Sequence, residues 1–131
     1  MPGTDMKPLV LHEGAGRTKV SLAIQSMGND LIVRLFNSQA HIGAVALSEY
    51  NPAENRASTS VLTRYGHRDD TIACMAAYRI CRRLKKPVCA IAGIHLDNIT
   101  KEEIDQIVSN CERLVDLYLK KQSAEKRNRK L

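Results

Sequence analysis

A continuous run of small and β-branched apolar residues, VCAIAGI, occupies positions 88–94. Pro87 precedes the run, and Asp97 and Asn98 follow it closely. An apolar run of this length, bounded by residues that favour turns, is typical of a strand buried on both faces of a sheet. Polar and titratable side chains come directly after the run, so the end of this strand is a candidate position for a functional site.

A long amphipathic helix is predicted directly after this strand. Thr100 and Glu103 have the spacing of a capping box, in which each side chain bonds the backbone N–H of the other residue. Glutamates at the start of the helix and lysines at its end suit the helix dipole. The apolar residues that recur on one face are Ile104, Ile107, Val108, Cys111, Leu114, Val115 and Tyr118.

Four strands are predicted before this segment. The first two form an antiparallel hairpin, because Gly28 and Asn29 tolerate the positive φ that a tight reversal needs. The third strand begins with small residues, which let another backbone or a ligand approach closely. The predicted strands are residues 19–27, 31–36, 41–47 and 58–65, and residues 9–11 offer a further short edge strand.

A second helix is predicted between the fourth strand and the apolar run. Asp69 and Asp70 fall in its first turn, and Pro87 ends it. Its buried face is Ala73, Ala77, Ile80 and Leu84. The resulting order, β-β-β-β-α-β-α, predicts the α+β class: one mostly antiparallel sheet with two helices on one face.

The opposite face of this sheet is predicted to be too apolar for free contact with water. The residues assigned to it are Ile32, Phe36, Val45 or Ala46, Thr59 and Val61. An exposed apolar sheet face indicates burial against a partner, most simply a second copy of the chain. We therefore expect a homodimer.

The net charge of +6 is a property of the C-terminal end. Residues 120–131 hold six basic residues and one acidic residue, and the remaining 119 residues carry only +1. We expect a single domain over residues 1–119, followed by a frayed basic tail. Because the charge lies in a tail without interleaved aromatic residues, nucleic-acid binding is not expected.

Four cysteines, Cys74, Cys81, Cys89 and Cys111, lack CxxC spacing and fall inside predicted elements. Together with the lack of a signal peptide, this pattern predicts reduced thiols in a soluble cytoplasmic protein. No stretch reaches the ~18 apolar residues that a membrane span requires.

Three histidines lie beside glycines at predicted strand ends: His41 near Gly43, His67 after Gly66, and His95 near Gly93. With Asp97, these side chains are predicted to meet at one edge of the sheet. Imidazole and carboxylate are metal ligands, but the spacing matches no metal motif, and histidines with ordinary hydrogen bonds are the commoner case.

Two further hypotheses stay open for the same residues. Histidine beside aspartate serves general acid–base chemistry, although Asp69, Asp70 and Asp97 equally fit helix capping or turns. The segment Gly66-His67-Arg68 at a helix start offers N–H groups and a guanidinium to a phosphate. The chain has neither a GxSxG elbow nor a phosphate-binding glycine loop.

Three segments, taken together and in order, resemble a known family. They are HIGAVA at 41–46, GHRDD at 66–70, and AGIHLDNITKEEI at 92–104. The resemblance is to the small prenylated-flavin chaperones, which include the D-subunit protein encoded beside gallate decarboxylase. It covers residues 17–119 and leaves out the basic tail.

The resemblance implies a cofactor carrier rather than an enzyme. Members of this family are dimeric α+β proteins, related in fold to proteasome assembly chaperone subunits, that bind reduced prenylated flavin mononucleotide and help to load it into apo decarboxylases of the UbiD type. The alternatives are a small metal- or histidine-dependent accessory enzyme and an assembly module without a cofactor. From where the motifs fall, we predict that the cofactor contacts His41, Gly43, Gly66, His67, Arg68, His95, Asp97 and Asn98, with Tyr50 and Tyr65 as the nearest candidates to stack on its ring.

Overall fold

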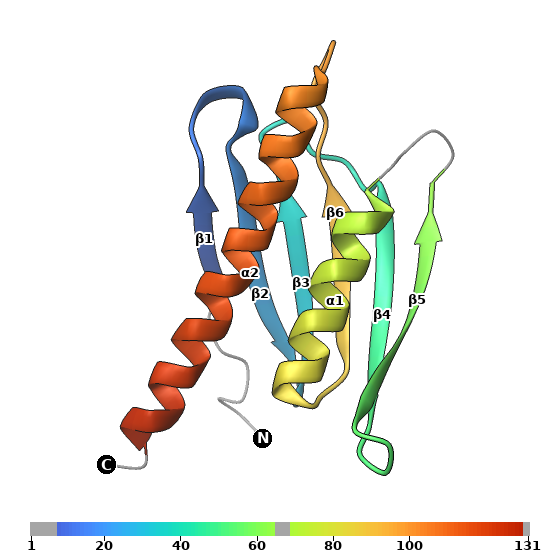
Figure 1. Cartoon of the computed structure of the whole chain (residues 1–131), viewed down its shortest axis with the longest axis vertical. Coiled ribbons are helices and arrows are strands. Elements are labelled where there is room, and N and C mark those ends of the chain that lie inside the picture. Colours follow the sequence, from blue (N-terminus) through green and yellow to red (C-terminus); the bar gives the residue numbers. More distant parts are fainter. Residues whose placement is uncertain (1–7, 65–68, 130–131) are drawn as a thin grey trace.

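A computed structural model describes residues 8–64 and 69–129, and within them the chain forms one six-stranded sheet with two α-helices on one face (Figure 1). The predicted α+β class is therefore confirmed. The elements are β1 (Leu9–Glu13), the 3-10 turn η1 (Gly16–Thr18), β2 (Val20–Met27), β3 (Asp30–Phe36), β4 (Ala44–Asn51), β5 (Arg56–Thr63), α1 (Asp70–Leu84), β6 (Val88–Gly93) and α2 (Lys101–Arg129).

The strand order is β1-β2-β3-β6-β4-β5. Residues 88–93 of the apolar run form β6, which therefore lies inside the sheet, between β3 and β4. β6 pairs in parallel with β3 and antiparallel with β4, and every other strand pair is antiparallel. The predicted hairpin pairs in register from Ser21 opposite Phe36 to Met27 opposite Asp30. The short edge strand proposed for residues 9–11 is present as β1.

The third strand begins three residues later than predicted. β4 starts at Ala44, and His41 and Ile42 lie in the loop before it. The reason is a backbone crossing at Gly93, where an added Cβ would lie 1.9 Å from the His41 carbonyl oxygen. A chain that passes so closely over the end of β6 does not continue the regular strand spacing of about 4.7–4.9 Å.

Helix α2 continues to Arg129, so residues 120–129 are helical where the sequence indicated a frayed tail. Lysine, arginine, glutamate, glutamine and alanine are good helix formers, and basic residues suit the C-terminal end of a helix. The division of the chain after residue 119 stays a prediction. Neither α1 nor α2 has an apolar stretch that would let it cross a bilayer, and the described residues contain no other helix that does.

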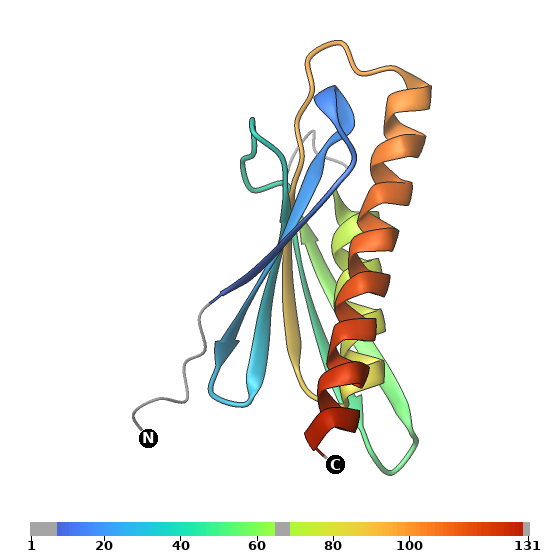
Figure 2. The ribbon, with the colours of Figure 1, turned by 90° about the vertical axis from the view of Figure 1, so that its left-hand side faces the viewer.

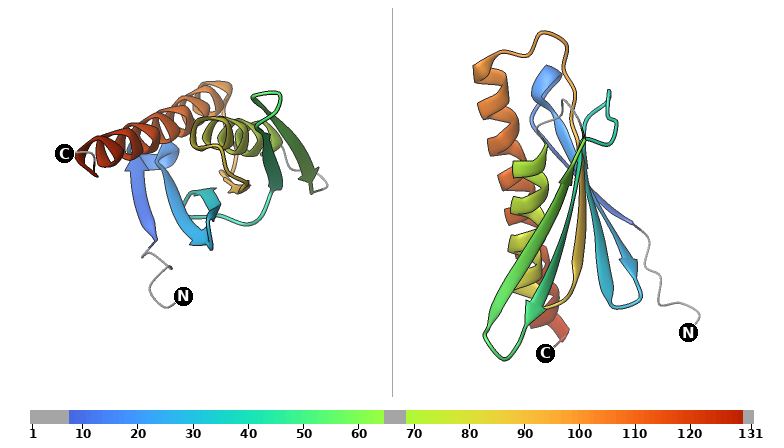
Figure 3. Two further views of the ribbon diagram at one scale, coloured as in Figure 1. Left: turned by 90° about the horizontal axis from the view of Figure 1, so that it is seen from below. Right: turned by 90° about the vertical axis from the view of Figure 1, so that its right-hand side faces the viewer.

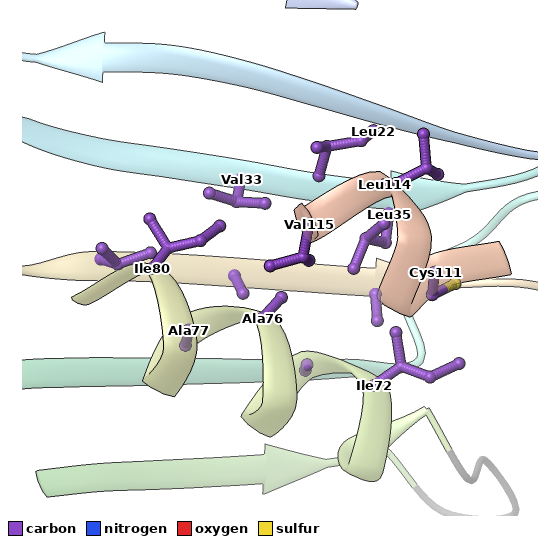
Figure 4. Packing of buried hydrophobic residues seen from close by; sticks show 14 of the residues in the cluster. Leu22, Val33, Leu35, Ile72, Ala76, Ala77, Ile80, Cys111, Leu114 and Val115 are labelled. Atoms are coloured by element: carbon purple, nitrogen blue, oxygen red, sulfur yellow. The ribbon is translucent and has the colours of Figure 1, made fainter. Parts of the chain in front are cut away.

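The core lies between the sheet and both helices (Figure 4). Helix α1 turns an alanine-rich face to the sheet, where Ala73, Ala76 and Ala77 are fully buried. These small side chains leave room for α2, whose Leu114 and Val115 are also fully buried. In Figure 4 the side chains of both helices converge on Leu22, Val33 and Leu35 of the sheet.

The other face of the sheet carries no helix, as the two side views show (Figures 2 and 3). Strand register places Arg34, Ile91, Val45 and Leu62 side by side on this open face, with Ile32, Cys89, Leu47 and Ser60 in the next row. Of the residues assigned there from sequence, Ile32, Phe36 and Val45 are correct. Ala46, Thr59 and Val61 are not, because the alternation along β4 and β5 turns them towards the helices.

The apolar run is thus buried on one face only. Val88, Ala90 and Ala92 are buried against the helices, whereas Cys89 and Ile91 on the open face are half-buried. The prediction of burial on both faces is wrong for the single chain, since within residues 8–64 and 69–129 no second layer covers the open face.

Truncating Leu114 to alanine should lower the free energy of unfolding by about 2–5 kcal/mol, because it leaves a cavity where α2 meets the sheet. The matched control is Leu117→Ala, three residues further along the same helix, whose side chain is 42% exposed. Urea unfolding followed by circular dichroism measures both changes. Equal losses for the two variants would contradict the core described here.

Candidate functional site

One end of the molecule, which we call the rim, gathers chain segments from every part of the fold (upper end in Figure 1). Strands β3 and β6 end there, since they run in parallel, and β4 begins there. The helices α1 and α2 also begin at the rim. The described connections at the rim include residues 37–43 and 94–100.

Two glycines let these segments approach one another. Gly93 lies under the backbone of His41, as described above. Gly43 lies against the buried carboxylate of Asp69, where an added Cβ would be 1.8 Å from Oδ2. The Gly43 N–H donates to the Ala92 carbonyl at 2.9 Å. The small residues predicted at these strand ends therefore serve close packing.

Two of the predicted histidines meet at the rim. The ring centroids of His41 and His95 are 5.2 Å apart, and the rings are tilted by 44°. His95 Nε2 lies 3.0 Å from Asp97 Oδ1, so the aspartate orients this imidazole. Both side chains of that pair are exposed. The rim thus presents two imidazoles and one carboxylate to solvent at one place.

The backbone of His95 is held by a residue that sequence reasoning did not select. Asn37 Nδ2 donates to the His95 carbonyl at 2.8 Å, and the His95 N–H donates to Asn37 Oδ1 at 3.2 Å. Asn37 is buried and follows β3 directly. The sequence does offer a signal for Asn37, because it is a polar residue immediately after a predicted strand, as the selected site residues are.

Arg17, from the turn between β1 and β2, holds the turn that carries Asp97. Its Nη2 donates to the Asp97 carbonyl at 2.8 Å, and its Nε donates to Glu103 at 2.7 Å. Glu103 also accepts the Thr100 N–H, and Thr100 Oγ1 accepts the Glu103 N–H, which confirms the capping box. Asn98 has a φ of 53° and forms the left-handed bend of this turn.

The bond from Arg17, followed by the bond from the Thr100 backbone, lowers the pKa of Glu103 from 4.5 to about 2. A carboxylate with a lowered folded-state pKa stabilises the fold above its unfolded pKa, and that contribution is lost as the pH falls through about 2. The turn at residues 97–100 therefore keeps its tie to Arg17 throughout the neutral and mildly acidic range.

An apolar cleft of about 750 Å³ opens between the starts of both helices and the segment that follows β6. Its volume lies in the range of about 300–1,000 Å³ that is usual for small-molecule sites. The walls are mainly isoleucine and leucine side chains, together with a few polar groups. The lining residues are Asp69, Asp70, Thr71, Ile72, Ile94, His95, Leu96, Ile99, Ile104, Ile107 and Val108.

Asp69 connects this apolar cleft to the core. Its carboxylate lies against Gly43, and its backbone carbonyl accepts the Ala73 N–H in the first turn of α1. Burial, with the negative charge of Asp69 as the next cause, raises the pKa of Cys111 to about 12. The Cys111 thiol is therefore protonated at neutral pH and serves as core packing.

The structure brings four of the eight predicted contact residues together: His41, Gly43, His95 and Asp97. Asn98 lies in the turn beside them. Gly66, His67 and Arg68 lie outside the described residues, as does Tyr65. Tyr50 is at the other end of β4, where its hydroxyl contacts Asn55, so it is not placed to stack on a ligand at the rim.

The described part of the structure does not support the hypothesis of a metal site. No group of three or more histidine, cysteine, aspartate or glutamate side chains there is arranged to hold an ion. His41, His95 and Asp97 lie near one another without forming such a set.

The fold has relatives among solved structures. A chain from the crystal structure of a chaperone complex for yeast 20S proteasome assembly matches it with a TM-score of 0.60 at 12% identity, over 91% of this chain and 96% of that chain. The chain thus has the fold of a proteasome assembly chaperone. A comparison with curated proteins returned no match.

Residues 14–123 match the family described as the prenylated flavin chaperone LpdD-like domain, and the chain belongs to that family. The match includes the rim, the apolar cleft and most of α2. It confirms the resemblance drawn from the three sequence segments.

Replacing Gly43 by alanine should destabilise the fold by about 1–3 kcal/mol, because the new methyl group overlaps the buried Asp69 carboxylate. The neighbouring Ile42→Ala is the control, since the Ile42 side chain is 54% exposed. Thermal unfolding measures the difference. A Gly43→Ala protein as stable as the control would contradict the close contact between Gly43 and the Asp69 carboxylate.

Proposed function

We propose that this protein binds reduced prenylated flavin mononucleotide and delivers it to an apo decarboxylase of the UbiD type, without catalysing a reaction itself. The apolar cleft at the rim, in a chain of the prenylated flavin chaperone LpdD-like family, is the observation that carries the proposal. The free thiols of all four cysteines suit the reducing cytoplasm, where we place the protein.

The side chains of the cleft suit a prenylated flavin. Such a ligand has a flat ring system enlarged by an apolar prenyl-derived ring, and burial of apolar surface is the main favourable term for holding it. Ile94, Ile99 and Ile104 line the cleft and supply that surface. His95, fixed by Asn37 and oriented by Asp97, offers an imidazole to the polar edge of the ring.

The cleft also suits a carrier that must release its cargo. Ile99 and Ile104 remain 39% and 45% exposed, so the site is open to solvent along one side. An open apolar site binds more weakly than an enclosed one because it removes less surface from water. A decarboxylase that encloses the cofactor fully would therefore take it from this protein.

The direct test is retention of the reduced cofactor during anaerobic gel filtration, followed by transfer to the apo decarboxylase. We expect co-elution of the flavin with the protein and recovery of decarboxylase activity on mixing. Absence of retention would overturn the proposal. Turnover of a carboxylic acid by this protein alone would favour the accessory-enzyme alternative, and indifference to flavin would favour an assembly module.

Two variants test the place of binding. His95→Ala and Ile104→Ser should each weaken retention, Ile104→Ser by about tenfold or more, since it removes apolar contact from the cleft. Leu117→Ser is the control, because Leu117 is similarly exposed on the same helix outside the cleft. Unchanged far-ultraviolet circular dichroism would show that the variants fold, and equal retention in all three would contradict the assigned cleft.

We further propose that the protein is a homodimer that pairs through the open face of the sheet. The surface in question, the open-face patch, consists of Val45, Leu47, Leu62 and Ile91. Leu47 and Leu62 are 52% and 78% exposed, which is unusual for neighbouring leucines on a sheet. Arg34 and Glu49 flank the patch on the same face, which allows two copies to pair unlike charges across a two-fold axis.

The double variant Leu47→Asp/Leu62→Asp should convert the dimer to a monomer, because it buries two carboxylates in the apolar interface. Val61→Asp is the matched control: Val61 is 39% exposed and adjacent to Leu62, but faces the helix side. Light scattering after gel filtration measures the mass. A wild-type monomer, or an unaffected double variant, would contradict pairing through this face.

A further inference from the structure

A second cleft, of about 540 Å³, lies on the other side of the segment that follows β6. Leu96 lines both this cleft and the apolar one, so the two sites share a wall. The chemistry of the second cleft is different. It takes His12 from β1, Arg17 and Lys19 from the turn that joins β1 to β2, and Ser21 and Phe36 from β2 and β3. We call it the basic cleft.

The sign of charge separates the two clefts. The apolar cleft has two carboxylates in its lining, Asp69 and Asp70. The basic cleft has Arg17, Lys19 and His12, and among the described residues no carboxylate lines it. Because Glu103 offsets the charge of Arg17, the attraction of the basic cleft for a phosphate dianion comes from Lys19, with His12 as a further hydrogen-bond donor.

Two of the three basic groups are available to a ligand. Arg17 is engaged with Glu103 and the Asp97 carbonyl, which fixes its guanidinium at the edge of the cleft. Lys19 is exposed, and within residues 8–64 and 69–129 its ammonium makes no ion pair. His12 shares a 2.7 Å hydrogen bond between its Nδ1 and Ser21 Oγ, which holds the ring in the lining of the cleft.

Phe36, the one phenylalanine of the sequence, also lines the basic cleft. Strand register places it in one row with Ser21 and His12 on the open face. The guanidinium of Arg34 lies 5.1 Å from the centre of its ring. An aromatic wall beside basic groups suits a ligand that joins an unsaturated or sugar-like chain to a phosphate.

We propose that the basic cleft binds the phosphate group of the flavin cargo, with Lys19 and His12 as its partners, while the ring system occupies the apolar cleft across Leu96. This assignment rests on the proposed carrier function and adds to it the recognition of a phosphate monoester. It also agrees with the proposed dimer, because His12 and Ser21 lie one row nearer the rim than the open-face patch.

The test compares reduced prenylated flavin mononucleotide with the same flavin after its phosphate has been removed. Anaerobic equilibrium dialysis gives both dissociation constants. We expect the wild-type protein to bind the phosphorylated form about tenfold more tightly or better, because charge-assisted hydrogen bonds to a phosphate commonly contribute that much affinity. In His12→Gln/Lys19→Gln this preference should fall to about twofold, with the affinity for the dephosphorylated flavin unchanged.

Lys101→Gln is the matched control, since Lys101 is an exposed lysine at the same rim that lines neither cleft. It should keep the wild-type preference. Equal binding of both flavins by the wild-type protein, or a preference that survives in the double variant, would overturn the phosphate site and leave the carrier function standing. Binding of neither flavin by the wild-type protein would overturn both.

Discussion

The rim depends on two places where chain segments come closer than any side chain would permit. At Gly93 the backbone of His41 crosses the end of β6, and at Gly43 the buried Asp69 carboxylate rests on the start of β4. The first crossing brings His41 to His95, and the second joins the start of α1 to the sheet. These contacts hold the start of α1 and the loop before β4, whereas Arg17 holds the start of α2 through Glu103. The glycines thus matter for geometry, and the polar side chains around them supply the chemistry.

The fold was largely predictable because its signals are local. Alternation in residues 19–36 defines the hairpin, and the spacing from Thr100 to Tyr118 defines α2 together with its cap. What the sequence did not indicate depends on contacts between distant segments. The start of β4 is displaced from His41 to Ala44 because the backbone crosses Gly93. Thr59 and Val61 face the helices because they pair with Ser48 and Ala46, which are on the buried face.

The candidate site was predictable only in part, for the same reason. Polar residues at strand ends identified His41, His95 and Asp97, which do meet. Arg17 and Asn37 were missed, since their roles arise from hydrogen bonds over 80 and 58 positions of sequence. The basic cleft was missed as well, because β1, β2 and β3 contribute to it jointly and no single segment is basic. Its separation from the carboxylates of the apolar cleft is visible only when the strands are placed side by side.

Helix α2 extends well beyond its last buried residue, Leu119, and carries lysines and arginines to the end farthest from the rim (Figure 1). The C-terminal half of α1 ends on the same side and adds Arg79, Arg82, Arg83 and Lys85. The opposite end is mixed in charge, because the carboxylates of Asp69, Asp70, Asp97, Glu102 and Glu103 lie there together with Arg17 and Lys19. The far ends of the two helices therefore form a basic surface at the opposite end of the molecule from the apolar and basic clefts. A negatively charged macromolecule that bound this basic surface would leave the mouths of both clefts uncovered.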